Sequence, residues 1–423
     1  MSRAARENLK TLLIAALLVS AVLLGRASGM FTGLVSAFSR TGAPTSAIVP
    51  GGVAETVSAE AARPGVIVLT DVSGARAVAK YDPAALDAMY ERTSGIVGEA
   101  LGASPELSEC DEEEWRQALR SPGVMFEYYA PAPLGVVRGW LGAREDEDTQ
   151  IRRLCLTFSG DASALYFQGD GGFYRAETAA LGSAPTVPAV YDDSHLYEFE
   201  KNPDSAAPYV ILIAGSSHPS VVSSNPLTSA ANVNSILSSL GIDNQQKPGY
   251  SGSDGTLVYV TNSFTLSISP DGTVIYRRSR ATGAAEPPED AETGVFSDST
   301  AVELARLVVA GALGAHSGDA RVYFSGFEKR GAAATVIFDY FIAGGRVFLQ
   351  YHDNAARVTI TDGVITYMSL CFRSYTPDAE VTLLPEAQTL AARAGEFGLG
   401  YSDAGSGALS PFWYGLDASE VTP

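Results

Sequence analysis

An uncharged, strongly apolar run near the N-terminus constrains this chain more than any other feature. From Thr11 to Gly25 the sequence reads "TLLIAALLVSAVLLG" and contains no charged residue. A helix over residues 9–28 would be about 30 Å long at ~1.5 Å per residue, which is enough to cross the hydrocarbon core of a bilayer. The remaining residues must therefore fold outside this segment, on one side of a membrane or the other.

The residues that flank the run indicate its orientation. Three basic residues precede it against a single acidic one, which by the positive-inside tendency places residues 1–8 in the cytoplasm and the bulk of the chain outside. A secretory signal peptide begins in the same way, and cleavage after Ala27 or Gly29 is the alternative. Because apolar residues continue at helical spacing as far as Phe38, we expect a retained, single-pass anchor in the cell membrane.

Small residues recur along the expected anchor helix. Ala16, Ser20, Ala21 and Gly25 lie near a four-residue spacing, and small side chains allow a second transmembrane helix to approach closely. We interpret these four residues as a contact for a partner helix. The alternative is that they only reflect the high alanine content of the whole chain.

The composition excludes several classes of function. The chain has 423 residues, of which 46% are hydrophobic and 18% charged, and these fractions are typical of globular domains. Its net charge of −19 argues against a nucleic-acid partner, because binding to phosphates requires a basic surface. We therefore expect globular domains outside the membrane that do not bind nucleic acid.

Residue types that carry catalysis or bind metals are scattered along the chain. There are three cysteines and four histidines, with no CxxC, HExxH or GxSxG spacing. The segment "GSSHPSVVSSN" (215–225) combines serine and histidine, but we interpret it as a polar loop that follows a buried strand at Tyr209–Ala214. We expect no catalytic, cofactor-binding or metal-binding residues and no enzymatic activity. An enzyme whose site the sequence conceals is the alternative.

Changes in composition divide the chain into regions. Small residues, Pro and Gly dominate 29–63, which predicts a juxtamembrane spacer. An α+β region follows at 64–280, with a second division near 201–207 as an alternative. A polar, Pro-containing linker is expected at 281–296, and a C-terminal α+β domain at 297–423.

Hydrophobic periodicity predicts α+β domains with antiparallel sheets. Turn dipeptides punctuate the strands, notably Asp271-Gly272, Gly344-Gly345 and Asp362-Gly363. We expect Ser108 to cap the helix at 112–120. The helices are expected at 83–101, 112–120, 133–142, 230–240, 299–313 and 385–394, and the first strands at 65–70, 123–129, 152–158, 164–169 and 172–177.

Aromatic residues crowd the strands of the C-terminal domain. Among them are Phe338, Tyr340, Phe348 and Tyr367, which strand alternation distributes over both faces of a sheet. If one face is uncovered, these side chains form a surface for a protein partner. The alternative is that the helices at 299–313 and 385–394 cover both faces.

The order of these elements resembles the YycH/YycI family, whose members are membrane-anchored accessory proteins of a cell-wall-sensing histidine kinase in low-GC Gram-positive bacteria. The resemblance covers most of the chain but rests on pattern rather than on a catalytic signature. The segments that carry it are "YDPAALDAMYERTSGIVGEALG", "SPGVMFEYYAPAPLGVVRGWLG", "SISPDGTVIYRR", "VIFDYFIAGGRVFLQYHDNAARVTITDGVITYMSLCFRSY" and "LSPFWY".

The resemblance implies regulation by contact. The anchor would pack with the transmembrane helices of a sensor histidine kinase, and the exterior part would contact the kinase or a related accessory protein in a heterodimer. The family has no catalytic residues or cofactors to carry over. The expected function is therefore that of a bitopic regulator of a two-component system. The alternative is an exported, membrane-tethered module that binds a ligand or a cell-wall fragment.

Overall fold

The structure of the chain is a computed structural model that describes residues 62–416, except for gaps at 104–105, 144–146, 160–161, 179–180, 182–190, 193, 216, 230–231, 235–236, 238–248, 280–296, 393–394 and 406. The expected anchor at 9–28, nearly all of the spacer, the linker at 281–296 and most of the helix at 230–240 lie outside the described residues. Among the helices that the structure does describe, none combines the length and the apolar character needed to cross a membrane.

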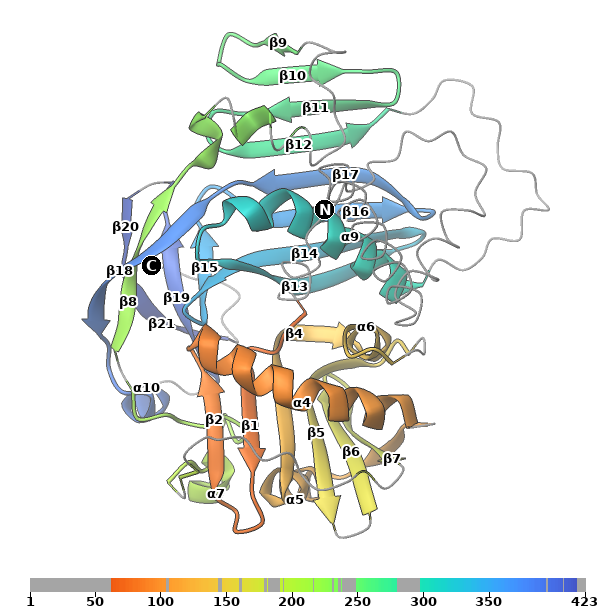
Figure 1. The fold of residues 1–423 in the computed structure, drawn as a ribbon, viewed down its shortest axis with the longest axis vertical. Coiled ribbons are helices and arrows are strands. Elements are labelled where there is room, and N and C mark those ends of the chain that lie inside the picture. The colour runs from red at the N-terminus through yellow and green to blue at the C-terminus, as the bar shows by residue number, and fades with distance from the viewer. Residues whose placement is uncertain are drawn as a thin grey trace, which may run out of the picture. The chain divides into compact units, whose positions relative to one another are not determined.

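A seven-stranded antiparallel sheet forms the first half of the described chain (Figure 1). Its strand order is β2-β1-β4-β5-β6-β7-β3, and the consecutive pairing of β5, β6 and β7 confirms the predicted meander. The strands are β1 (Val66–Thr70), β2 (Arg76–Lys80), β3 (Ser108–Cys110), β4 (Gly123–Pro133), β5 (Gln150–Ser159), β6 (Ala162–Gly169) and β7 (Gly172–Thr178).

Strand alternation gives this sheet two buried faces. In β4, Val124 and Phe126 point to one face and Met125 points to the other. The first face packs under α4 (Pro83–Ala103) and α6 (Leu134–Trp140). The second packs under α5 (Glu112–Arg120) and the segment around α7 (Glu198–Lys201), which contributes Phe199. The predicted helices at 83–101, 112–120 and 133–142 are thus confirmed.

The N-cap of α5 differs from the prediction. Ser108 lies in the edge strand β3, and Asp111 caps the helix instead. The Asp111 carboxylate accepts a hydrogen bond from the backbone N–H of Glu114 at 2.8 Å, and the Glu114 side chain accepts one from the backbone N–H of Asp111 at 3.3 Å. This reciprocal capping box satisfies two amide groups at once, and Ser108 lies three residues before the N-cap position, in β3.

An eleven-stranded sheet forms the second half, in the order β21-β19-β15-β14-β16-β17-β12-β11-β10-β9 with β13 paired to β14. All pairs are antiparallel except β15 with β19. The strands are β9 (Tyr250–Ser251), β10 (Leu257–Val260), β11 (Phe264–Ile268), β12 (Thr273–Arg278), β13 (Arg321–Arg330), β14 (Ala333–Ile342), β15 (Gly345–Leu349), β16 (Ala356–Thr361), β17 (Val364–Cys371), β19 (Phe397–Asp403) and β21 (Pro411–Gly415).

Helix α9 (Asp298–Leu313) packs on one face of this sheet against β13, β14 and β16 (Figure 1). The predicted hairpin turns at Asp271-Gly272 and Asp362-Gly363 are confirmed, and at Asp362-Gly363 both φ angles are positive, 51° and 74°, as a two-residue type I′ turn requires. Between β14 and β15 the positive φ angles, 47° and 72°, are at Ala343 and Gly344, so this turn lies one residue before the predicted Gly344-Gly345. β12 pairs with β17, so strands from both sides of the 281–296 segment lie in one sheet.

A three-stranded sheet completes the α+β fold, in the order β18-β8-β20. Its strands are β8 (Ser217–Ser224), β18 (Ser374–Thr382) and β20 (Gly407–Leu409), and α10 (Glu386–Ala392) follows β18. Short 3-10 helices occur at Pro226–Thr228 and Gly314–His316.

The predicted order of a strand followed by a loop at 209–225 is wrong. Tyr209–Ala214, expected as a buried strand, makes only an isolated bridge between Ile211 and Tyr197, whereas the serine-rich segment expected as a loop is strand β8. Ile211 is buried against the α5 face without needing a ladder. β8 is a strand because β18 and β20 pair with its two edges. These pairings cannot be predicted from the sequence of β8 itself.

Candidate functional site

The aromatic residues predicted as a partner surface have different environments. Phe338 and Tyr340 are 0% and 1% exposed, and the Tyr340 hydroxyl donates a hydrogen bond to the backbone carbonyl of Cys371 at 2.9 Å. The expectation that these two side chains form an exposed contact is therefore wrong, because they point to the face of the sheet that is buried. Their positions in β14 place them in the core.

Phe348 and Tyr367 are half-buried. The Phe348 ring packs edge-on against Tyr414, with centroids 4.8 Å apart, and the guanidinium of Arg277 lies 5.8 Å from the centroid of Tyr367. Their role in partner contact stays a prediction. The helix-packing residues Ala16, Ser20, Ala21 and Gly25 lie outside the described residues.

Buried charges gather where the seven-stranded sheet meets the C-terminal strands. We call six residues from β2, β4, β5, α10 and the start of β19 the junction cluster. Its cations are balanced by an equal number of carboxylates, so the cluster as a whole is neutral. Its members are Lys80, Glu127, Arg152, Arg153, Glu386 and Glu396.

One side of the junction cluster is centred on Glu386, whose side chain is fully buried at the start of α10. Its carboxylate accepts hydrogen bonds from the Lys80 ammonium at 2.6 Å, the Tyr81 hydroxyl at 2.8 Å and the backbone N–H of Ile213 at 2.8 Å. Burial and the charge of Glu386 raise the pKa of Tyr81 well above its usual value. The carboxylate thus ties β2, α10 and the segment that leads into β8.

His218 borders this side of the cluster. Its ring makes edge contacts with Tyr81 and Trp413, at centroid distances of 5.2 and 5.3 Å. Its Nε2 atom is buried, and no residue in the described part of the chain forms a hydrogen bond with it. Burial lowers the pKa of His218, and the charges of Glu386 and Glu380 offset this only in part. The uncharged ring is therefore the form that fits this site.

On the other side of the junction cluster, four charged side chains form a ring of four ion pairs. Arg152 pairs with Glu127 and Glu396 at 3.0 Å each, and Arg153 pairs with the same two carboxylates at 2.8 Å each. Burial alone would raise the pKa of Glu127, but the charges of Arg153 and Arg152 outweigh it and hold the pKa below its usual value. The four side chains join β4 and β5 to the strand β19.

A cavity of about 80 Å³ lies beside the junction cluster. The seven-stranded sheet contributes one wall, and β19, β21 and the β14–β15 turn contribute the other. Four members of the cluster, two cations and two carboxylates, line it together with aromatic side chains. The polar and aromatic lining residues include Lys80, Tyr81, Glu127, Tyr129, Arg152, Phe341, Glu396, Phe397 and Tyr414.

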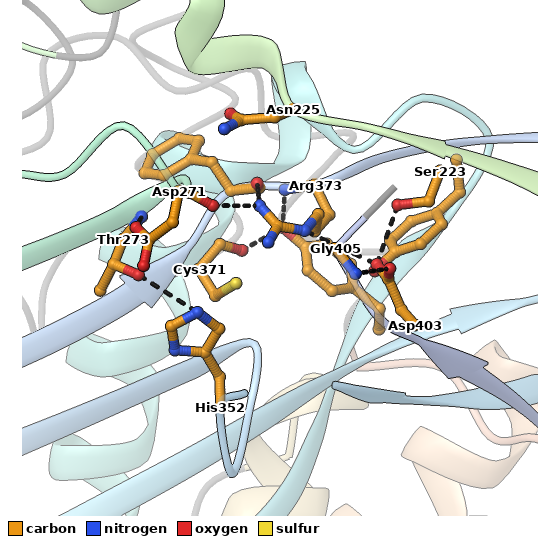
Figure 2. Close-up of polar contacts among 12 residues, drawn as sticks. Ser223, Asn225, Asp271, Thr273, His352, Cys371, Arg373, Asp403 and Gly405 are labelled. Atoms are coloured by element: carbon orange, nitrogen blue, oxygen red, sulfur yellow. Dashed lines mark hydrogen bonds and ion pairs between the residues drawn. The ribbon is translucent and has the colours of Figure 1, made fainter. Parts of the chain in front are cut away.

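A second buried ion pair, Arg373 with Asp403, joins the three-stranded and eleven-stranded sheets (Figure 2). Asp403 Oδ2 accepts hydrogen bonds from the hydroxyls of Ser223 in β8 and Tyr375 in β18, both at 2.8 Å. Arg373 donates to the backbone carbonyl of Asp271 at 2.6 Å. Because its oxygens are occupied by groups from several strands, this cluster serves to hold the sheets together.

These clusters were not predicted from the sequence. The available signal was a charged residue inside an otherwise apolar strand, such as Glu127 in "GVMFEYY" or the arginines in "RRLCLTF". That signal indicates a buried ion pair but does not identify the partner, because Glu386 and Glu396 are distant in the sequence. Over the described residues, no group of histidine, cysteine and acidic side chains is placed to hold a metal ion.

Comparison with solved structures finds a chain of the same fold, the crystal structure of YycH from Bacillus subtilis. The TM-score is 0.50 at 10% sequence identity, and the match covers 87% of this chain and 95% of that chain. No model of a known protein family matches the chain, and no curated protein matches it either. At this identity the likeness establishes a YycH-like fold, as the sequence patterns predicted.

Proposed function

We propose that this chain is a membrane-anchored, non-enzymatic accessory protein that regulates a sensor histidine kinase of a two-component system by contact. The observation that carries the proposal is the likeness to YycH over 87% of the chain. The apolar run at 11–25 supports it, because a retained anchor would hold the exterior fold beside a membrane kinase. The family resemblance implies a role in cell-wall homeostasis and a related accessory protein as a second partner.

The proposal is tested by reconstituting the full chain with the histidine kinase that co-purifies with it from solubilised membranes of its source. Autophosphorylation of the kinase in nanodiscs should change several-fold when the chain is present. Replacing Ala16, Ser20 and Gly25 with leucine should abolish this change, because bulky side chains prevent close helix approach. The control variant carries Val19→Leu and Val22→Leu, which keep the run apolar without altering the small residues, and it should regulate normally.

A chain that begins at Arg63 separates tethering from the exterior fold. It should lose regulation in nanodiscs, since it lacks the anchor. If it regulates as well as the full chain, or if no histidine kinase co-purifies, the proposal is wrong. Mature protein found in the culture medium with a start after Ala27 or Gly29 would exclude a retained anchor.

The second candidate function is a membrane-tethered module that binds a ligand or a cell-wall fragment. The cavity beside the junction cluster favours the binding of a small ligand rather than a cell-wall fragment, because small-molecule sites commonly lie where two parts of a fold meet and combine aromatic walls with a few polar groups. Regulation of a kinase and binding of a ligand are separable in the reconstituted system, since the first requires the kinase and the second does not.

A further inference from the structure

The cavity beside the junction cluster has the size of a very small ligand. Its volume is about 80 Å³, and a single water requires about 10–15 Å³ on the same measure. The space therefore corresponds to roughly five to eight groups the size of a water molecule. The site is partly open, so a sugar ring or a peptide would extend beyond this space into solvent, whereas a single small amino acid fits within it.

The charges on the cavity wall favour an occupant with no net charge. Lys80 and Arg152 are balanced by Glu127 and Glu396, so a bound anion or cation would leave one uncompensated charge in a buried site. Such a charge is costly in a protein interior. An occupant that carries both signs, or neither, avoids this cost.

Hydrogen-bond donors and acceptors on the cavity wall both have unused hydrogen-bonding capacity. The Lys80 ammonium has three donor positions, and its two hydrogen bonds within the described residues go to Glu386 and the Ile211 carbonyl. The ion pairs of Glu127 all use Oε1, and the described residues provide no hydrogen bond to the Tyr129 hydroxyl. The site thus offers donors for a carboxylate and an acceptor for an ammonium group.

From these properties we propose that the cavity is a binding site for a zwitterion the size of a single small amino acid. The ligand carboxylate accepts hydrogen bonds from Lys80 and Tyr129, and its ammonium donates to Glu127. The rings of Phe341, Phe397 and other aromatic residues enclose its carbon atoms. This pairing keeps the site neutral and uses the groups that the junction cluster leaves available.

Isothermal titration calorimetry on the full chain in detergent tests the class of ligand, with glycine as the probe. We expect a dissociation constant of about 1 mM or lower, which five non-hydrogen atoms can provide. Acetate and methylammonium each present one of the two charges and should bind at least tenfold more weakly. The assignment would be overturned if glycine gave no heat of binding at about 10 mM, tenfold above the expected dissociation constant, or if acetate and glycine bound equally well.

A pair of tyrosine variants tests the location. Tyr129→Phe removes one hydroxyl and keeps the ring that packs on Phe341 with centroids 3.8 Å apart, so glycine should bind at least threefold more weakly to a folded chain. The matched control is Tyr276→Phe, because Tyr276 is also buried but lies in β12 and is not among the residues that line the cavity. Unchanged binding to Tyr129→Phe would contradict the proposed site. Neither measurement involves a kinase, so failure here leaves the proposed regulatory function intact.

Discussion

His218 shows how one buried side chain makes the fold sensitive to pH. It packs between Tyr81 and Trp413, near the ammonium of Lys80 and the carboxylates of Glu386 and Glu380. Its pKa in the folded chain lies below the usual value, so as the pH falls the unfolded chain takes up the proton first. The stability that neutral His218 contributes is therefore present above about pH 6.5 and is lost as the pH falls through its folded pKa.

The variant His218→Phe keeps an aromatic ring in this site and removes the titration. We expect the free energy of unfolding of the wild-type chain to fall more steeply between pH 7 and pH 5 than that of His218→Phe. Urea denaturation at several pH values measures both slopes. His316→Phe serves as the comparison, because burial also lowers the pKa of His316 but at another place in the fold. Equal slopes for wild type and His218→Phe would rule out this role.

The hydrogen bonds to Asp403 allow a second residue-scale prediction. Tyr375→Phe removes one donor from a carboxylate that is fully buried, and leaving such a group less satisfied costs about 1–3 kcal/mol. The control is Tyr197→Phe, because the described residues provide no hydrogen-bond partner for the buried Tyr197 hydroxyl, so that its removal should cost less than Tyr375→Phe does. Chemical denaturation compares the two, and similar losses in both variants would show that the Asp403 contact is weak.

At the scale of elements, Glu386 fixes α10 to β2. Glu386→Gln would leave the Lys80 ammonium and the junction cluster with an uncompensated charge, which we expect to destabilise the fold by about 3–5 kcal/mol. The double variant Lys80→Met with Glu386→Leu removes both charges. It should lose less stability than Lys80→Met and Glu386→Leu lose in sum, because neither charge is then left unpaired. A double-mutant cycle by urea denaturation measures this coupling, and strictly additive losses would contradict it.

The elements that sequence patterns predicted well are those whose cause is local. α4 follows from apolar residues at helical spacing and from Pro83 at its start. The helix predicted at 299–313 is α9, which begins one residue earlier, after the N-cap Ser297. The turn at Asp362-Gly363 follows from residues that tolerate a positive φ. Strands β5 to β7 are joined by short turns, so neighbours in sequence are neighbours in the sheet.

The features that sequence patterns missed depend on distant partners. β8 is a strand because of β18 and β20, which lie far along the chain. The burial of Phe338 and Tyr340 depends on which face of the eleven-stranded sheet is covered, and period-2 alternation does not distinguish the two faces. The junction cluster requires Glu127 and Glu396 to meet across the fold, and no local rule specifies that pairing.

At the scale of the whole molecule, three strand pairings, one of them between β8 and β20, connect the chain on either side of residues 281–296. β12 pairs with β17 along Thr273 to Arg277, and β8 pairs with β18 along Ser217 to Ser224. In residues 297–423 alone, β17, β18 and β20 would therefore each have an edge without its partner strand. The core would also lose the apolar side chains of β11 and β12. Such edges promote association between chains.

We therefore expect residues 297–423, expressed alone, to aggregate or to lack a cooperative unfolding transition, because the missing strands cannot be replaced by solvent. Co-expression with residues 1–280 should restore a soluble, non-covalent pair, since all three pairings can re-form between separate chains. The full chain provides the reference, and its circular dichroism should report a single transition for the described fold. A monomeric fragment 297–423 with its own sharp transition would mean that the pairings of β12 and β8 add to a core that is already complete.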